Sequence, residues 1–586
     1  MYIEKIDGPA DLKTFSVKEL DILSDELRQV LLKKVSEHGG HIGPNLGMVE
    51  ATVALHYVFH SPIDKVVFDV SHQSYIHKML TGRKEAFIYP ERYDEVSGYS
   101  EPSESEHDFF VIGHTSTSVS LACGLAKARD LKGDKENIIA VIGDGSLSGG
   151  EAFEGLNNAA ELDSNFIVLV NDNQMSIAEN HGGMYKNLQL LRETDGKAEC
   201  NFFKTFGFDY LYVKEGNNVH ALIEAFSKIK DIDHPIVVHI NTVKGKGYRF
   251  AEENKEKFHA GGPFDLATGQ PKMDAGGKEN YGNLTAEYLL DKMKKESTLI
   301  AITSATPTIF GFNPERRKQA GKQFIDVGIA EEHAVAMASA IAKNGGKPVF
   351  GVFSTFIQRA YDQMSQDLCI NNTPALILVF GGSMSSMTDV THLGYFDIPL
   401  ISNIPNMVYL APTNKEEYFA MMEWGIMQTS HPVAIRVPAN GVISSGEKID
   451  EDYGLLNRYK VNVSGSKVAI IGLGSFYQLG ESVVEELKNK ANIDATLINP
   501  RYITGLDTKV LEDLKKNHTL VVTLEDGLLD GGFGEKVTRF YGPSEMKVLN
   551  FGVKKEFVDR FSVDELLREN HLTSSQITED ILNVIK

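Results

Sequence analysis

The stretch "GDGSLSGGEAFEGLNNAAELDSNFIVLVNDN", residues 143–173, places polar side chains directly after two apolar runs. Asp144 follows the run "NIIAVIG", and Asn173 closes the turn after "NFIVLV". Both runs are apolar throughout, which is typical of strands that are buried on both faces of a parallel sheet. Ligands of such sheets bind beyond the carboxyl ends of the strands. We therefore expect Asp144 and Asn173 to lie close together at one edge of a sheet.

Oxygen atoms from Asp144 and Asn173 would suit Mg²⁺, which commonly takes one or two protein carboxylates together with phosphate oxygens. Glycines flank Asp144, so backbone amides can approach an anion closely there. The helix expected to follow would offer its N-terminal amides to phosphate. A Gly-Asp-Gly turn by itself is a common surface turn. Its combination with a second polar turn at a strand end predicts a magnesium–diphosphate site.

Apolar runs of the same kind recur in three blocks along the chain. The first includes "KVVFDV" and "HPIVVHINT", the second "TLIAITSA" and "PALILVFGG", and the third "SKVAIIGLG" and "HTLVVTLED". Together they predict three doubly wound α/β domains with mostly parallel sheets. Two charged, Gly-containing segments suit linkers. The expected boundaries are a diphosphate- and metal-binding domain at 1–251, a linker at 252–283, a second domain at 284–440, a linker at 441–460 and a C-terminal domain at 461–586.

Length and composition restrict the class of protein. A chain of 586 residues with 42% hydrophobic and 24% charged residues is ordinary for a globular protein, and it is too long for one core. The net charge of −21 disfavours nucleic acid and anionic membranes as partners. We expect no secretory signal, because the first residues are polar and charged, and no membrane span, because no apolar stretch is long enough. We expect a cytoplasmic protein that acts on small molecules.

Five further segments carry a resemblance to a known family. They are "GGHIGPNLGMVEATVALHYVF", "FDVSHQSYIHKMLTGR", "GHTSTSVSLACGLAKA", "IAEEHAVAMASA" and "FSTFIQRAYDQ". With them the chain resembles the 1-deoxy-D-xylulose-5-phosphate synthase family of transketolase-like enzymes. The resemblance implies thiamine diphosphate and Mg²⁺ as cofactors, and a homodimer. The implied reaction condenses pyruvate, with decarboxylation, and glyceraldehyde 3-phosphate to 1-deoxy-D-xylulose 5-phosphate, the first step of non-mevalonate isoprenoid precursor synthesis.

The resemblance also implies roles for individual residues in cofactor binding. Asp144, Asn173 and the carbonyl of Met175 would hold the metal. Ile177 would prop the cofactor into its bent shape, although an isolated isoleucine is more often an ordinary core residue. The remaining residues implied to contact the cofactor are His72, Gly113, His114, Thr115, Gly145, Ser146, Tyr248, Glu331 and Phe356.

The implied chemistry depends first on Glu331. In the family this glutamate bonds the pyrimidine ring of the cofactor and activates it, whereas an acidic residue at a helix start can also simply favour the helix dipole. His41 and His392 are candidates for proton transfer, since an imidazole titrates near neutral pH. His259 is a third catalytic candidate. His259 and Arg359 are also candidates for binding the carboxylate of pyruvate, the donor substrate. His333 and Arg436 complete the expected substrate residues.

The chain departs from the family pattern on the acceptor side. Gly381 stands where an arginine is expected, Phe353 where a tyrosine is expected, and Thr388 where an acidic residue is expected, with Asp389 one place later. Asn440 and its neighbours supply no second arginine after Arg436. An arginine–phosphate contact contributes roughly 1.5–3 kcal/mol. Its loss weakens binding of a phosphorylated aldehyde about tenfold or more unless another cation substitutes. The sequence therefore does not identify the aldehyde that serves as the acceptor substrate.

Other hypotheses remain beside this one. A transketolase-type enzyme could transfer a two-carbon ketol unit or use a different aldehyde acceptor. A binding protein could have kept the fold and lost catalysis, although Glu331, Asp144 and Asn173 argue against that. "IIGLGSFYQLG" suggests a nicotinamide site, but Tyr477 occupies the third glycine position of that motif. "EHGGH" at 37–41 lacks the spacing of a zinc-binding helix, and the three cysteines form no CxxC pair.

Overall fold

The computed structural model describes residues 1–272, 279–446 and 449–585. The chain forms two compact units, which are described separately. Unit 1 lies within Met1–Gly277 and includes Gly328–Ala330, and unit 2 takes the rest of the chain. The predicted linkers at 252–283 and 441–460 fall partly on residues 273–278 and 447–448, which lie outside the described residues. The three-domain division with its boundaries stays a prediction.

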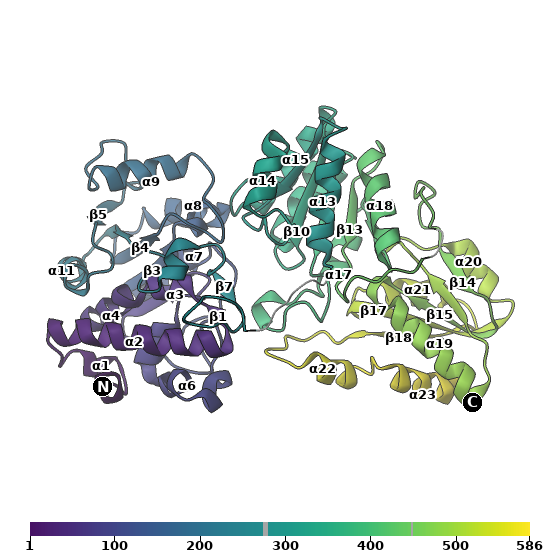
Figure 1. Cartoon of the computed structure of the whole chain (residues 1–586), viewed down its shortest axis with the longest axis horizontal. Coiled ribbons are helices and arrows are strands. Elements are labelled where there is room, and N and C mark those ends of the chain that lie inside the picture. Colours follow the sequence, from purple (N-terminus) through teal and green to yellow (C-terminus); the bar gives the residue numbers. More distant parts are fainter. Residues whose placement is uncertain (273–278, 447–448, 586) are drawn as a thin grey trace. The chain divides into compact units, whose positions relative to one another are not determined.

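Unit 1 is built on a parallel sheet of five strands in the order β2-β3-β4-β6-β5, of which β3, β4 and β5 are labelled in Figure 1. Its strands are β2 (Lys65–Phe68), β3 (Ile138–Gly143), β4 (Phe166–Asp172), β5 (Asp209–Val213) and β6 (Pro235–Asn241). A separate antiparallel pair joins β1 (Gly40–His41) to β7 (Ala260–Gly261). The segment expected to be a linker therefore contributes a strand to this unit before residue 273.

Both faces of the unit 1 sheet are buried. Along β3, Ile139 and Val141 pack with one core cluster and Ile138, Ala140 and Ile142 with another, as the uninterrupted apolar run predicts. The helices of this unit are α1 (Pro9–Leu12), α2 (Val17–His38), α3 (Gly43–Gly47), α4 (Val49–Val58), α5 (Tyr75–Lys78), α6 (Glu85–Ile88), α7 (Ser118–Lys132), α8 (Gly150–Ala159), α9 (Met184–Glu193), α10 (Phe202–Phe206), α11 (Val219–Ile229) and α12 (Arg249–Glu253).

Unit 2 contains a parallel sheet of six strands in the order β12-β13-β11-β10-β8-β9. Its strands are β8 (Leu299–Thr303), β9 (Phe324–Asp326), β10 (Lys347–Phe353), β11 (Leu376–Phe380), β12 (Val408–Leu410) and β13 (Val433–Arg436). The accompanying helices are α13 (Tyr281–Met293), α14 (Pro314–Ala320), α15 (Glu331–Lys343), α16 (Tyr361–Gln363), α17 (Asp397–Ser402) and α18 (Lys415–Met427).

A second sheet of unit 2 has the order β14-β16-β15-β17-β18, with only β14 antiparallel. Its elements are β14 (Lys460–Val463), β15 (Lys467–Gly472), α19 (Tyr477–Ala491), β16 (Thr496–Asn499), α20 (Thr508–Leu514), β17 (His518–Leu528), α21 (Phe533–Tyr541), β18 (Lys547–Val553), α22 (Val563–Glu569) and α23 (Ser574–Ile585). One core cluster joins the two sheets, since it contains both Phe350 and Val521.

These sheets confirm the predicted α/β class with mostly parallel strands. Six strands of the described residues had no counterpart among the predicted runs: β1, β5, β7, β12, β13 and the polar β14, whose side chains are exposed or half-buried. Within the described residues, no helix is long and apolar enough to cross a membrane.

Candidate active site

Asp144 and Asn173 lie together at the carboxyl edge of the unit 1 sheet. β3 and β4 pair in parallel up to Gly143 and Asn171, and the Asp144 amide continues the pairing by donating to the Asn171 carbonyl at 3.0 Å. This register brings the Asn173 amide nitrogen to 3.5 Å from Oδ1 of Asp144. Both side chains are buried. The juxtaposition expected from the two strand ends is therefore present.

The donor set around Asp144 fits a divalent cation. Asn180 donates its side-chain amide to Oδ2 of Asp144 at 2.6 Å. The amide oxygens of Asn173 and Asn180 are both buried without a hydrogen-bond partner among the described residues. Burial and the nearby Asp172 raise the pKa of Asp144 to about 7. A bound Mg²⁺ would stabilise the carboxylate and satisfy oxygens that are costly to bury alone.

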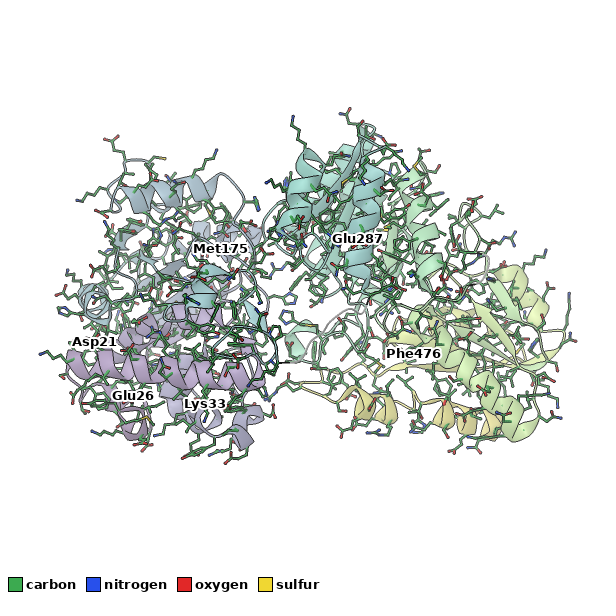
Figure 2. All side chains as sticks on the ribbon, in the orientation of Figure 1. Asp21, Glu26, Lys33, Met175, Glu287 and Phe476 are labelled. Carbon is green, nitrogen blue, oxygen red and sulfur yellow. The ribbon has the colours of Figure 1, made fainter. Side chains whose placement is uncertain are left out.

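The third expected metal ligand, Met175, lies on the loop that follows β4 (Figure 2). Its backbone pairs with that of Glu179, which folds residues 175–179 back on themselves. Gln174 precedes it with a φ of 66°, a conformation uncommon for a residue with a side chain. This turn carries the backbone of Met175 and the side chain of Asn180 on the same short loop as Asn173.

Asp172, between Asn171 and Asn173, is engaged elsewhere. His239 lies 2.9 Å from one carboxylate oxygen, and Arg192 forms an ion pair with the same oxygen. The Gln174 amide donates to the other oxygen at 3.2 Å. Burial opposes ionisation of Asp172, but His239 and Arg192 outweigh it and hold its pKa below the usual value. Asp172 therefore anchors the loop and leaves Asp144 as the carboxylate for a metal.

The predicted diphosphate residues lie next to this edge. Gly145 and Ser146 follow Asp144, and a Cβ at Gly145 would lie 2.7 Å from the Cβ of Ser176. Only glycine fits there, because the loop carrying Met175 passes directly over it. Ser146 is buried. Gly113, His114 and Thr115 lie on the loop that leads into α7.

Three of the predicted histidines form a cluster in unit 1. The ring of His41 lies 5.0 Å from that of His72 and 5.8 Å from that of His259, and the last two are 5.4 Å apart. The β1–β7 pair produces this contact, since it sets His41 opposite Ala260. Burial, Lys244 and the other two histidines hold the pKa of His259 well below its usual value. His259 is therefore neutral at physiological pH.

Lys244 connects the histidine cluster to the loop that follows β4. Its ammonium donates to the Ser176 carbonyl at 2.5 Å and lies 3.1 Å from Nδ1 of His259. When Lys244 is protonated it can only donate, so Nδ1 of His259 is then the acceptor and the ring proton is on Nε2. Burial lowers the pKa of Lys244 to about 7, against the opposing effect of Asp144.

Ile177 and Tyr248 differ in their surroundings. Ile177 is half-buried on the loop between Ser176 and Ala178. Tyr248 packs in an aromatic group with Phe250, Phe258 and Phe264, and its hydroxyl donates to the Leu266 carbonyl at 3.1 Å. The contacts of Tyr248 are those of a core residue, and they give its expected cofactor role no support.

In unit 2, Glu331 is a buried carboxyl at the first residue of α15. Its Oε2 has no hydrogen-bond partner among the described residues and lies 3.8 Å from Arg359. Burial raises the pKa of Glu331 to about 7, although Arg359 opposes the shift. A carboxyl that is half protonated at neutral pH and open to one more partner fits a group that must hydrogen-bond a ring nitrogen.

Phe356 and His392 pack together near the end of β10. Their rings lie 5.7 Å apart at a steep angle, and Phe356 makes a similar contact with Phe353. Nδ1 of His392 lies 3.2 Å from Asp389 and 2.8 Å from the Thr391 hydroxyl. Burial opposes ionisation of Asp389, but His392 and Thr391 outweigh it and lower its pKa. Asp389, one place beyond the expected acidic position, therefore orients His392.

A small cavity of about 10 Å³ adjoins these residues. That volume accommodates roughly one water molecule. Its lining includes Phe353, Gly381, Ser386 and His392. Gly381 has a φ of 68°, and a Cβ there would lie 2.7 Å from the Ser386 hydroxyl and 3.0 Å from the Phe353 ring. The departures at 353 and 381 therefore fit one another, since the ring and the hydroxyl occupy space that a side chain at 381 would need.

Arg436 and His333 were both expected to bind substrate, but their surroundings do not suit that role. Arg436 makes a buried two-point contact with Asp397, at 2.7 and 3.1 Å, and donates to the Asp526 carbonyl at 2.6 Å. Its guanidinium is thus committed within unit 2. His333 is exposed, two residues after the buried Glu331 on α15. Neither position supports the expected role.

Asn180 and Lys244 were not among the residues predicted from the sequence. Asn180 lies in "SIAENHG", beyond the turn that the strand-end rule covers. Lys244 lies in "KGKGY", where only the tyrosine was selected. A buried lysine is rare unless it is paired, and no pattern in the sequence indicates that Lys244 is buried.

Comparisons with known proteins cover nearly the whole chain. Residues 3–201 and 194–242 match the family model "1-deoxy-D-xylulose-5-phosphate synthase". Residues 279–442 match "Transketolase, pyrimidine binding domain", and residues 457–577 match "Transketolase, C-terminal domain". Together with the parallel sheets, these matches define a transketolase-like enzyme of the transferase type, which depends on thiamine diphosphate and a divalent metal ion.

Curated relatives narrow the class further. The 1-deoxy-D-xylulose-5-phosphate synthase of Caldanaerobacter subterraneus is 38% identical over 622 aligned positions, covering 100% of this chain and 99% of the relative. The synthases of Clostridium beijerinckii and Chlorobaculum tepidum are each 36% identical and cover at least 99% of this chain and 98% of the relative. The chain belongs to the 1-deoxy-D-xylulose-5-phosphate synthase family.

Solved structures of transketolases are more distant. The transketolase of Campylobacter jejuni aligns at 16% identity with a TM-score of 0.44, covering 97% of this chain and 100% of that one. A transketolase from Pichia stipitis aligns at 14% identity with a TM-score of 0.44, covering 96% and 97% of the two chains.

Proposed function

We propose that this chain condenses pyruvate with glyceraldehyde 3-phosphate, with loss of CO₂, to form 1-deoxy-D-xylulose 5-phosphate. Full-length similarity to synthases of that name carries the proposal. The buried carboxyl of Glu331, with its raised pKa, supports it, because a cofactor with a basic ring nitrogen needs such a partner. When bound, thiamine diphosphate supplies a carbon nucleophile and accepts the electron pair left behind when CO₂ departs.

The metal and the diphosphate are assigned to unit 1. Asp144, Asn173 and the Met175 carbonyl would hold Mg²⁺, with Asn180 fixing the second oxygen of Asp144. The backbone of Gly113–Thr115, Gly145 and Ser146, together with His72, would hold the diphosphate. The half-buried Ile177 remains our candidate for a contact with the cofactor rings. Tyr248 stays a weaker candidate because of its core packing.

The remaining residues would act on protons and substrate. Glu331 would share a proton with the pyrimidine nitrogen, and Phe356 would stack on that ring. Neutral His259 would donate its Nε2 proton to the donor carboxylate, supported by Lys244, and His41 would act beside it. His392, oriented by Asp389, would move a proton at the acceptor aldehyde oxygen. Arg359, half-buried beside Glu331, is the better placed of the two arginines first assigned to substrate.

The test is release of ¹⁴CO₂ from labelled pyruvate across a panel of aldehydes. We expect release to require an added aldehyde and to be fastest with glyceraldehyde 3-phosphate, with 1-deoxy-D-xylulose 5-phosphate as product. Glu331→Gln should abolish release, while Glu332→Gln, its half-buried neighbour, should retain it. Ketol transfer from a ketose phosphate without CO₂ release would instead identify a transketolase reaction.

We further propose that the protein is a cytoplasmic homodimer, as the family resemblance implies. Sedimentation velocity of the purified protein checks the oligomeric state. A monomer at micromolar concentration would contradict it.

A further inference from the structure

A buried aspartate connects the loops assigned to the diphosphate. Asp69 follows β2 directly and is 1% exposed. Its Oδ2 accepts the backbone amide of Ser116 at 2.8 Å, and its Oδ1 accepts that of Ser118 at 2.9 Å. Ser116 follows Thr115, the last of the predicted diphosphate residues in this loop. One carboxylate therefore fixes the backbone immediately after Gly113–Thr115.

The same loop is fastened to the second diphosphate segment. The hydroxyl of Ser116 donates to the Ser146 carbonyl at 2.8 Å. A Cβ at Gly149 would lie only 2.1 Å from that hydroxyl, so Gly149 leaves the space that the contact needs. Asp69, Ser116 and Ser146 thus form a continuous chain of contacts from the end of β2 to the turn after β3.

The backbone around this chain of contacts is strained. Val70, Ser71 and Ser116 have φ angles of 58°, 67° and 77°. Such values are uncommon for residues with a side chain and are most unfavourable for a β-branched one. Ser71 is held in place because its hydroxyl donates to the Ile112 carbonyl and accepts the Ser100 amide, both at 2.7 Å. Strain of this kind persists where surrounding contacts enforce it, and it is concentrated at binding sites.

We propose that Asp69 is the positioning residue of the diphosphate site. By holding Ser116, it sets the loop 113–115 at a fixed separation from the Gly145–Ser146 turn, so that backbone amides of both segments face one anion. The carboxylate of Asp69 bonds to protein groups, namely the backbone amides of Ser116 and Ser118 and the hydroxyl of Ser146, and we expect it to make no contact with the cofactor. This inference rests on the assignment of residues 113–115 and 145–146 to the diphosphate in the proposed function.

The test compares two aspartates at opposite ends of β2. Asp64, directly before the strand, is also buried, and its carboxylate accepts the amides of His60 and Asn137, each at 2.7 Å. Asp69→Asn and Asp64→Asn each leave one backbone amide facing an NH₂ group, so both variants should lose thermal stability. Only Asp69→Asn should loosen the cofactor loops.

The readout is the Kd of thiamine diphosphate, measured by calorimetry with excess Mg²⁺ and without substrate. We expect Asp69→Asn to weaken binding about tenfold or more and Asp64→Asn to change it less than twofold. At saturating cofactor, kcat of Asp69→Asn should stay within about threefold of the wild type. Wild-type affinity in Asp69→Asn, or an equal loss in both variants, would overturn the inference.

A second variant covers the case in which Asp69→Asn does not fold. Ser116→Ala removes the contact with Ser146 and leaves Asp69 intact, and we expect it to weaken cofactor binding about fivefold. Unchanged binding in Ser116→Ala would count against the inference. Because binding is measured without turnover, a wild-type protein that binds thiamine diphosphate but releases no CO₂ would contradict the proposed reaction alone.

Discussion

The side-chain amide of Asn180 donates to Asp144 at 2.6 Å while its own oxygen is buried beside that carboxylate without a described partner. This arrangement predicts that Asn180 supports the metal site. Asn180→Ala should weaken Mg²⁺ binding about tenfold, because it removes a hydrogen bond that orients a ligand. Calorimetric titration of Mg²⁺ in the presence of thiamine diphosphate measures the change. Asn187→Ala, which removes an amide bonded to the Cys200 carbonyl in the same unit, is the control and should leave the affinity unchanged.

The raised pKa of Glu331 predicts that the free energy of unfolding of the cofactor-free protein falls as pH rises. The Glu331 pKa of about 7 lies above its ordinary value of 4.5, so the folded state retains a proton that the unfolded state has lost between these pH values. The stability that this group contributes is therefore fully present below pH 4.5 and is lost as pH rises through about 7, by on the order of 3 kcal/mol.

Glu331→Gln removes the loss of stability that ionisation of the buried carboxyl causes. We expect the variant to melt at a higher temperature than the wild type at pH 8, with the difference shrinking towards zero near pH 4.5. Differential scanning calorimetry of the cofactor-free proteins across this range checks it. A difference that is independent of pH would show that Glu331 does not titrate as its burial predicts.

The contact between Asp389 and His392 predicts that removing the carboxylate of Asp389 lowers the reaction rate. Asp389→Asn should lower kcat about tenfold, because the imidazole loses the carboxylate that fixes its orientation. The KM for pyruvate should stay within about twofold. Steady-state kinetics with glyceraldehyde 3-phosphate measure both, and Thr388→Ala, at the position where the family carries the acidic residue, should stay near wild type. Equal losses in the two variants would contradict this role.

The surroundings of Gly381 predict that arginine, the residue expected from the family at this position, is not accommodated there. Gly381→Arg should destabilise the protein by on the order of 1–3 kcal/mol, since its Cβ would meet Ser386 and Phe353 at a φ of 68°. Gly441→Arg is the matched control, because Gly441 has a φ of 88° but no atom near its Cβ position. A lower melting temperature in Gly381→Arg than in Gly441→Arg isolates the crowding. Tighter binding of the aldehyde without loss of stability would contradict the prediction.

The part of the site that follows from strand geometry could be predicted from the sequence. Asp144 and Asn173 meet because parallel strands bring their carboxyl ends to one edge, and an uninterrupted apolar run reveals such strands. The strand–helix pattern likewise placed Glu331 at the start of α15, whereas its catalytic role was implied only by the family resemblance. Both predictions depend on local pattern, which a single sequence displays directly.

Contacts between distant segments could not be predicted in this way. The family resemblance implies that Arg436 binds substrate, yet Asp397 and the Asp526 carbonyl occupy it from other parts of unit 2. Tyr248 lies in a conspicuous motif, but three phenylalanines surround its ring. The same residue types serve binding or packing, and only the partners brought by the fold decide between them.

The contacts of Arg436 also set a limit on engineering the acceptor side. Asp526 accepts the Met384 amide at 3.0 Å and holds Arg436 through its carbonyl, so the segment at 381–392 is fastened to β17 of the neighbouring sheet. Gly382 lies against the ion pair between Arg436 and Asp397, where a Cβ would meet Arg436 at 2.9 Å. A segment transplanted from a relative into this position would thus need a compatible β17, because contacts from both sheets of unit 2 hold it in place.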